Sequence, residues 1–160
     1  MNNFFSRIEY LQSIFTYLTI KICFTDFVMK IIGVIDKYPL LRKGMVFFIQ
    51  NQFQEATILE STTTEMFLET YPNQEPDLIV LGISQNNSAF HNMAYIKLIK
   101  TKWKSTSLVV YDELPEPDMV LHYLNAGIKG YVSKRNAMTE FKQCLHNVMK
   151  GERYVSKGIF

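Results

Sequence analysis

Residues 76–82 read Pro-Asp-Leu-Ile-Val-Leu-Gly, and this stretch decides the fold. Its four apolar residues, Leu78 to Leu81, follow one another without a polar interruption. A run this short, rich in β-branched side chains and bounded by turn residues, is typical of a strand buried on both faces of a parallel sheet. We therefore expect a central strand here, covered by elements that precede it and elements that follow it in the sequence.

Similar short runs lie on both sides of this strand, and each is an expected strand: residues 31–35, 56–59, 108–111 and 130–132. The segments between them carry helix signals. Proline at the first position of a helix loses no hydrogen bond, so Pro39 and Pro117 can each open one. Thr62 followed by Glu65 has the spacing of a capping box, and Gly127 is suited to end a helix.

A less regular helix is expected near residues 88–101, and Asn136 can cap a last helix. Five strand-then-helix repeats predict an α/β fold with a doubly wound, five-stranded parallel sheet of the flavodoxin-like type. Ligand sites in such folds lie at the carboxyl ends of the strands. The candidate site residues are those that follow the strands: Asp36, Lys37, Gly82, Asp112 and Lys134.

Composition limits the function classes. The chain has 160 residues, which suffices for one domain, and its 48% hydrophobic residues can form a core. A net charge of +2 is too weak to indicate a nucleic-acid partner. Cys23 and Cys144 have no metal-ligand or disulfide spacing, and with no signal peptide we expect a cytoplasmic protein.

The first 28 residues differ from the rest. They are rich in aromatic and aliphatic residues, and their polar residues fall at helical spacing, which predicts an amphipathic helix. Glu9, Lys21 and Asp26 interrupt any membrane-length run, and Lys and Arg, which a surface anchor would need, are scarce. We therefore expect no membrane contact, with this segment as the one place where it could occur.

Two interpretations of this segment remain open, because Met29 begins the first strand region like a natural start. Either the extension packs on the domain or on a second copy, or it results from a start codon placed too far upstream. The expected organisation is an extension over residues 1–28, a domain over 29–156 and a tail over 157–160.

Four stretches resemble the receiver domain of LuxR/NarL-type response regulators. Residues 35–44 (IDKYPLLRKG) are similar to the family's V-D-D-H-P-L-L-R-E-G, and residues 76–82 to its P-D-L-V-L-L-D. Residues 125–134 (NAGIKGYVSK) are similar to R-A-G-A-x-G-Y-L-x-K, and residues 151–156 (GERYVS) to G-E-x-Y-x-S. The resemblance implies the receiver (βα)5 fold from about Met29 to Ser156, and a role in two-component signal transduction.

The departures from the family pattern concern its chemistry. The resemblance places the family's phosphate-accepting aspartate at Gly82, and glycine has no nucleophile. The family's Mg²⁺ ligands reduce to Asp36, because Lys37 replaces the second carboxylate; we expect weak or absent metal binding and no cofactor. The family's small hydroxyl residue corresponds to Asp112 or, one position earlier, to Tyr111.

Lys134 is retained, and Tyr131 resembles the aromatic residue that the family uses as a switch reporter. One hypothesis is an internal lock of salt bridges, in which Lys37 stands where Mg²⁺ would lie and Asp112 supplies the negative charge of a phosphate. The other is drift after loss of function.

The sequence thus predicts a non-enzymatic pseudo-receiver that acts through protein partners, including a second copy of itself, and does not bind nucleic acid directly. The expected contact faces include Met119, His122, Tyr123, Phe141, Cys144 and Leu145. The alternatives are a module that binds a small molecule or anion through Lys37 and Lys134, an enzyme on the same fold, and nucleic-acid contact through the lysines around Trp103.

Overall fold

The computed structural model describes residues 30–84, 89–135 and 138–160. The N-terminal extension and Asn136, the expected cap of the last helix, lie outside these residues. The described chain forms a six-stranded sheet in which every pair of neighbours is parallel, in the order β2-β1-β3-β4-β5-β6. The strand β2 lies on one side of β1, whereas β3 and all later strands lie on the other side. The topological switch point is therefore between β1 and β3.

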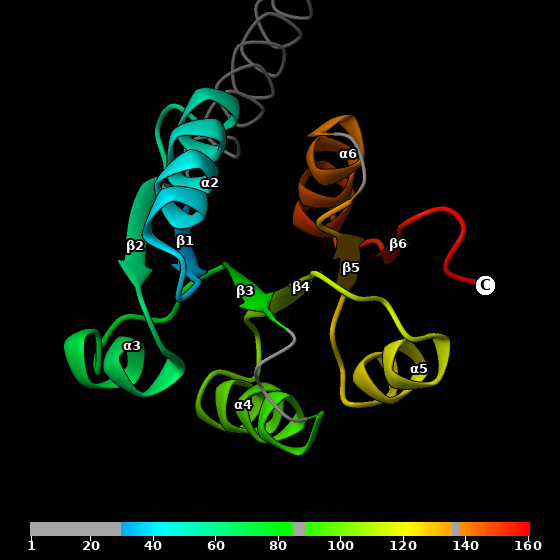
Figure 1. The fold of residues 1–160 in the computed structure, drawn as a ribbon. Helices are drawn as coiled ribbons and strands as arrows, with labels where there is room; N and C mark the ends of the chain where they lie inside the picture. Colours follow the sequence, from blue (N-terminus) through cyan, green and yellow to red (C-terminus); the bar gives the residue numbers. More distant parts are fainter. Residues whose placement is uncertain (1–29, 85–88, 136–137) are drawn as a thin grey trace, which may run out of the picture.

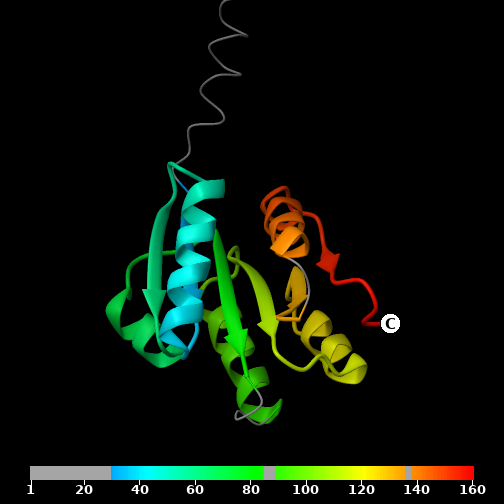
Figure 2. The same ribbon diagram turned by 45° about the horizontal axis from the view of Figure 1, so that its top comes forward.

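The strands are β1 (Ile31–Ile35), β2 (Thr57–Ser61), β3 (Leu78–Ile83), β4 (Ser107–Asp112), β5 (Gly130–Ser133) and β6 (Tyr154–Val155). The helices are α2 (Pro39–Gln52), α3 (Thr64–Thr70), α4 (Ala89–Lys102), α5 (Pro117–Asn125) and α6 (Met138–Met149). Figures 1 and 2 show α2 and α6 on one face of the sheet and α3, α4 and α5 on the other. The predicted doubly wound α/β architecture is confirmed.

The predicted count of five strands is wrong by one. Residues Tyr154 and Val155 add a sixth strand at the edge next to β5, where Tyr154 N donates to Lys129 O at 3.0 Å and Ser156 N to Tyr131 O at 2.9 Å. Two residues are too few to show strand periodicity in a sequence. In the segment after it, Ile159 is only 8% exposed and joins the core.

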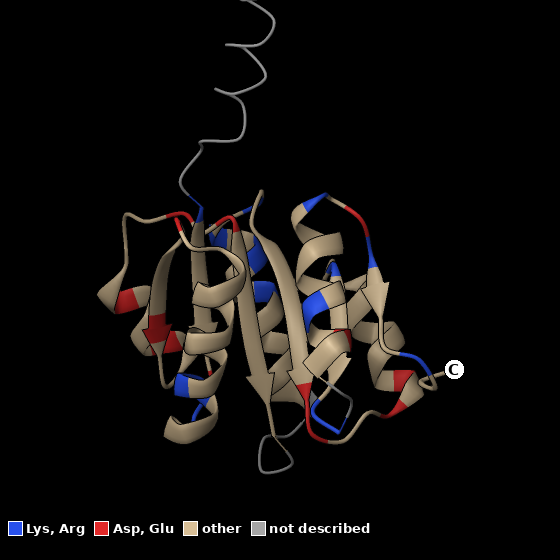
Figure 3. Ribbon diagram, turned by 90° about the horizontal axis from the view of Figure 1, so that it is seen from above, with Lys and Arg blue, Asp and Glu red and all other residues tan. Residues whose placement is uncertain are grey.

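The core has two halves, one on each face of the sheet, and β3 supplies both. Ile79, Leu81 and Ile83 pack toward α3, α4 and α5, whereas Leu78 and Val80 pack toward α2 and α6. In Figure 3 the long central strands are almost free of charge, and the charged residues lie on helices and at strand ends. This division explains why the sequence of β3 is apolar without alternation.

The helix ends agree with the turn chemistry except at one residue. Thr63, not Thr62, caps α3, because Thr63 Oγ1 accepts from Met66 N at 3.2 Å while the Thr62 hydroxyl bonds to Met66 Sδ. Gly127 follows α5 with φ at 97°, a left-handed conformation that glycine adopts at low cost. None of the helices in the described ranges combines the length and apolarity needed to cross a membrane.

Candidate functional site at the strand ends

Asp36 is the centre of the polar contacts at the carboxyl end of β1. Its side chain is 1% exposed, and Oδ1 accepts from Tyr38 N at 2.8 Å while Oδ2 accepts from Lys134 Nζ at 3.1 Å. The Lys134 side chain is 11% exposed, so both partners of this ion pair are nearly buried. Removing one partner of such a pair strongly destabilises the fold, because the remaining buried charge is left without compensation.

Gly82 lies beside this pair, near the end of β3. A Cβ atom added to Gly82 would fall 2.6 Å from Asp36 Cγ and 2.9 Å from Asp36 Cβ, and nearer still to Oδ2. Non-bonded carbon atoms do not approach so closely. The carboxylate of Asp36 therefore occupies the space into which any side chain at position 82 would extend.

Lys134 consequently takes its carboxylate from β1 and not from β3. The ion pair joins residues 98 positions apart, and it ties the end of β5 to the end of β1 across β3 and β4. The Lys134 ammonium also lies 5.7 Å from the ring centroid of Tyr111 and 5.8 Å from that of Tyr38. These aromatic faces attract the cation and exclude water from it.

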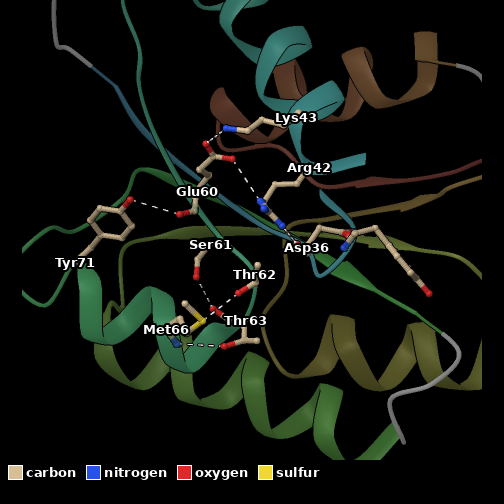
Figure 4. A network of polar contacts seen from close by, with 10 residues as sticks. Asp36, Arg42, Lys43, Glu60, Ser61, Thr62, Thr63, Met66 and Tyr71 are labelled. Atoms are coloured by element: carbon tan, nitrogen blue, oxygen red, sulfur yellow. Dashed lines mark hydrogen bonds and ion pairs between the residues drawn. The ribbon is translucent and has the colours of Figure 1, made fainter. Parts of the chain in front are cut away.

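The main chain around Asp36 is fixed by an ion-pair network that the sequence reading missed (Figure 4). Arg42 Nη1 donates to Asp36 O at 2.7 Å, and Arg42 Nε donates to Glu60 Oε2 at 3.3 Å. Lys43 Nζ donates to the other oxygen of Glu60, and this contact is the main cause of the lowered pKa of that carboxyl. Arg42 and Lys43 lie one helical turn into α2, the helix that follows β1. This spacing was the signal in the sequence that could have indicated the network.

Of the hypothesised four-charge lock, the described residues form only the pair of Asp36 and Lys134. Lys37 makes no ion pair with any residue of the described ranges, and its Nζ lies 5.0 Å from the centroid of the Tyr38 ring. Lys37 is also one of the residues that line a cavity on the α3 and α4 side of the sheet. Asp36 and Lys134 alone form the charge pair, because they are the residues whose side chains meet beside Gly82.

Asp112 has a different partner, the buried aromatic residue of β5. Tyr131 is 0% exposed, and its hydroxyl donates to Asp112 Oδ2 at 2.7 Å. Asp112 Oδ1 accepts from Leu114 N at 3.1 Å. Burial and, second, this hydrogen bond raise the pKa of the Tyr131 phenol, so the hydroxyl stays protonated and continues to donate.

Both residues that the sequence offered for the family's small hydroxyl are committed to other contacts. Tyr111 pairs with Gly82 in the sheet register, and its ring lies 5.0 Å from that of Phe141 on the α2 and α6 side. Asp112 pairs with Ile83 and contacts Tyr131.

The donor set around Asp36 does not fit Mg²⁺. That ion needs several hard oxygen ligands in octahedral geometry, whereas the Asp36 oxygens accept from Lys134 and Tyr38, and Lys37 brings a positive charge. Within the part of the chain that the structure describes, no cluster of three or more His, Cys, Asp or Glu side chains could hold a metal ion.

The expected contact faces mostly serve the core. Tyr123, Phe141, Cys144 and Leu145 are at most 2% exposed. His122 is exposed, and Leu121 beside it is 49% exposed, so the outer surface of α5 is the part of that face open to a partner. Trp103 is also buried, edge-on to Phe67 at 6.0 Å, and therefore offers no ring on which a base could stack.

Comparison with known proteins shows the fold family. No family model matches the sequence. The chain is 25% identical over 125 residues to the nitrate/nitrite response regulator protein NarL of Escherichia coli (strain K12), covering 78% of this chain. It spans about 57% of the length of that relative.

Solved structures with the same fold include a LuxR-family two-component response regulator from Aurantimonas sp. SI85-9A1, with a TM-score of 0.71 and 20% identity over 82% of this chain and 92% of that one. The isolated REC domain of RcsB from Salmonella enterica serovar Typhimurium, in the presence of the phosphomimetic BeF3-, has a TM-score of 0.71 and 19% identity. The match covers 82% of this chain and 96% of that domain. The chain has the fold of a response regulator receiver domain.

Proposed function

We propose that this chain is an atypical receiver domain of the LuxR/NarL type that does not accept a phosphoryl group and regulates by contact with protein partners. One observation carries the proposal. The Asp36 carboxylate fills the space beside Gly82 and is held there by Lys134 and by the Tyr38 amide. Position 82 thus has no nucleophile, and Asp36 leaves no room for one.

Asp36 itself is a poor substitute for the missing acceptor. Attack on phosphorus requires a carboxylate oxygen that is free to approach it in line. Here one oxygen is bound to an ammonium and the other to a main-chain amide, and the residue is 1% exposed. We therefore expect the side chains of the strand-end pocket to have a single arrangement within the receiver fold.

The contact between Tyr131 and Asp112 supports a fixed arrangement. The resemblance gives Tyr131 the position of the family's switch aromatic, and here its ring is buried with its hydroxyl bound to a carboxylate. Changing the rotamer of Tyr131 would leave Oδ2 of Asp112, a residue that is 6% exposed, without this donor. We infer that the surface above β5 and α5 is presented to partners in one conformation.

Phosphoryl transfer provides the direct test. The full 160-residue chain is incubated with acetyl phosphate and Mg²⁺, and its intact mass is measured. The parent is expected to form no adduct. A stable phosphoryl adduct on the parent would contradict the proposal, and peptide mapping would identify the accepting residue.

The matched variants are Gly82→Asp and Gly82→Asp combined with Lys37→Asp. The double variant restores the family's three carboxylates, and an adduct on it requires Asp36 to leave the space beside position 82. Circular dichroism of each variant shows whether it is folded.

The partner prediction is tested separately. A second copy is the first partner to examine, by sedimentation velocity over a range of concentrations. Absence of direct nucleic-acid binding stays a prediction, which electrophoretic mobility shift with duplex DNA would check. Binding at physiological salt would contradict it.

A further inference from the structure

A small cavity lies next to the strand-end pocket, on the side of the sheet covered by α3 and α4. The ends of β1 and β3 form its floor, and Thr62, Thr63 and Thr64 form one wall. Asn92 and Tyr95 of α4 form the opposite wall, and Lys37 also lines it. Its volume is about 110 Å³. The cavity therefore sits at the switch point of the sheet, where this class of fold binds its ligands.

Two buried polar atoms of the cavity wall have no hydrogen-bond partner. Thr64 is 1% exposed and Asn92 is 4% exposed, and neither Thr64 Oγ1 nor Asn92 Oδ1 is bonded to any described residue. The third such side-chain atom in the described ranges is Oγ of Ser84, the residue that follows Ile83 of the cavity floor. Buried polar groups are nearly always paired in folded proteins. The presence of two of them, Thr64 Oγ1 and Asn92 Oδ1, on the walls of one cavity indicates a group that binds there.

The charge of the lining indicates the sign of that group. Lys37 is the one charged residue among the described residues that line the cavity, and it is not engaged in an ion pair with them. Asp36, the nearest carboxylate in sequence, is directed to Gly82 and Lys134 instead. A cation beside hydroxyl and amide groups is complementary to a small anion with its own hydrogen-bonding groups.

We propose that this cavity binds a small carboxylate that also carries a hydroxyl or amino group. The carboxylate pairs with the Lys37 ammonium, and the hydroxyl or amino group donates to Asn92 Oδ1 and meets the Thr64 hydroxyl. The small volume of about 110 Å³ favours a compound of two or three carbons. This site is independent of the phosphorylation-independent role proposed above.

Two threonines of equal burial provide a matched test. Thr64 and Thr106 are both 1% exposed, but the Thr106 hydroxyl donates to Pro76 O at 2.6 Å whereas the Thr64 hydroxyl has no partner. Thr→Val keeps the shape and removes the hydroxyl. Thr64→Val should leave the melting temperature of the free protein unchanged or raise it, because no bond is lost. Thr106→Val should lower it.

The probes are glycolate, L-lactate, glycine and L-serine, with acetate and inorganic phosphate as controls at equal ionic strength. At a concentration a hundredfold above its dissociation constant, a bound probe should raise the melting temperature of the parent by about 5–10 °C. Amide chemical shifts in the NMR spectrum should change at residues 62–64 and at Gly82. Thr64→Val and Lys37→Met should lose this response, and Thr106→Val should keep it.

Several results would overturn the proposal. One is that no probe among the four alters the melting temperature or the spectrum. Another is that acetate or phosphate acts as strongly as they do, which would mean nonspecific anion binding. A third is that Thr64→Val destabilises the free protein as much as Thr106→Val, which would mean that solvent already satisfies the hydroxyl.

Discussion

Replacing Gly82 by alanine tests the central feature of the site. The added Cβ would lie 2.6 Å from Asp36 Cγ, so the Asp36 side chain must leave its position. It then loses the Lys134 ammonium at 3.1 Å and the Tyr38 amide at 2.8 Å. Leaving one partner of a buried ion pair uncompensated costs about 3–5 kcal/mol. For a domain of this size we expect a fall in melting temperature of roughly 6–20 °C.

Gly44 provides the control for the same chemical change. It lies inside α2, is exposed, and has no atom within 4 Å of an added Cβ. Alanine is the better helix former by about 1 kcal/mol, so Gly44→Ala should stabilise the protein. The melting temperatures of both variants are measured by thermal unfolding, monitored by circular dichroism.

A double-mutant cycle locates the cause. In an Asp36→Gly background the ion pair is already absent and neither the carboxylate nor a Cβ at position 36 blocks position 82, so Gly82→Ala should cost much less than in the parent. Equal melting temperatures for the parent and Gly82→Ala would refute the reasoning. So would the same loss in both backgrounds, because the contact with the Asp36 carboxylate would then not be its source.

Three further changes follow from the same contacts. Lys134→Met should lower the free energy of unfolding by about 3–5 kcal/mol in chemical denaturation. Lys37→Met should change that free energy by no more than about 0.5 kcal/mol. Equal effects of the two substitutions would support the four-charge lock instead. Tyr131→Phe removes the donor to Asp112 and should cost about 1–3 kcal/mol, and a neutral result would show that this carboxylate finds another donor. Burial raises the pKa of the Cys144 thiol to about 12, because the buried site favours the neutral thiol over the thiolate. The contribution of the neutral thiol to folding stability is therefore fully present below pH 9, the ordinary range of a thiol, and is lost as pH rises toward 12. In a background without the other cysteine, native protein at pH 8 should react with a thiol reagent only as fast as it unfolds, and rapid labelling would contradict this.

The position of the site was predictable because parallel strands end at one edge. Short apolar runs give the strands, and the residues after them must then meet. That reasoning brought Asp36, Gly82 and Lys134 into one group, and the structure does place them in contact. Which pairs of charges form was not predictable, because a strand-end side chain can point toward either face of the sheet.

The cavity residues gave little signal in the sequence. Thr64 and Asn92 are ordinary helix residues until α3 and α4 pack against the ends of β1 and β3 and bury them. The sixth strand was missed for a related reason, since Tyr154 and Val155 form a strand only because the edge of β5 offers partners. A two-residue strand is too short to show a periodicity of its own.

The sequence by itself determined the α/β class, the order of strands and helices, the chain's likeness to receivers and the absence of a carboxylate at position 82, because these depend on local patterns and residue identity. The tertiary structure alone decided that Asp36 fills the space beside Gly82, that Tyr131 bonds to Asp112, and that Lys37 faces a separate cavity. The physical reason is the same in each case. Side-chain direction and partner choice in a buried site are set by packing between segments far apart in the chain, as with the 98 residues between Asp36 and Lys134.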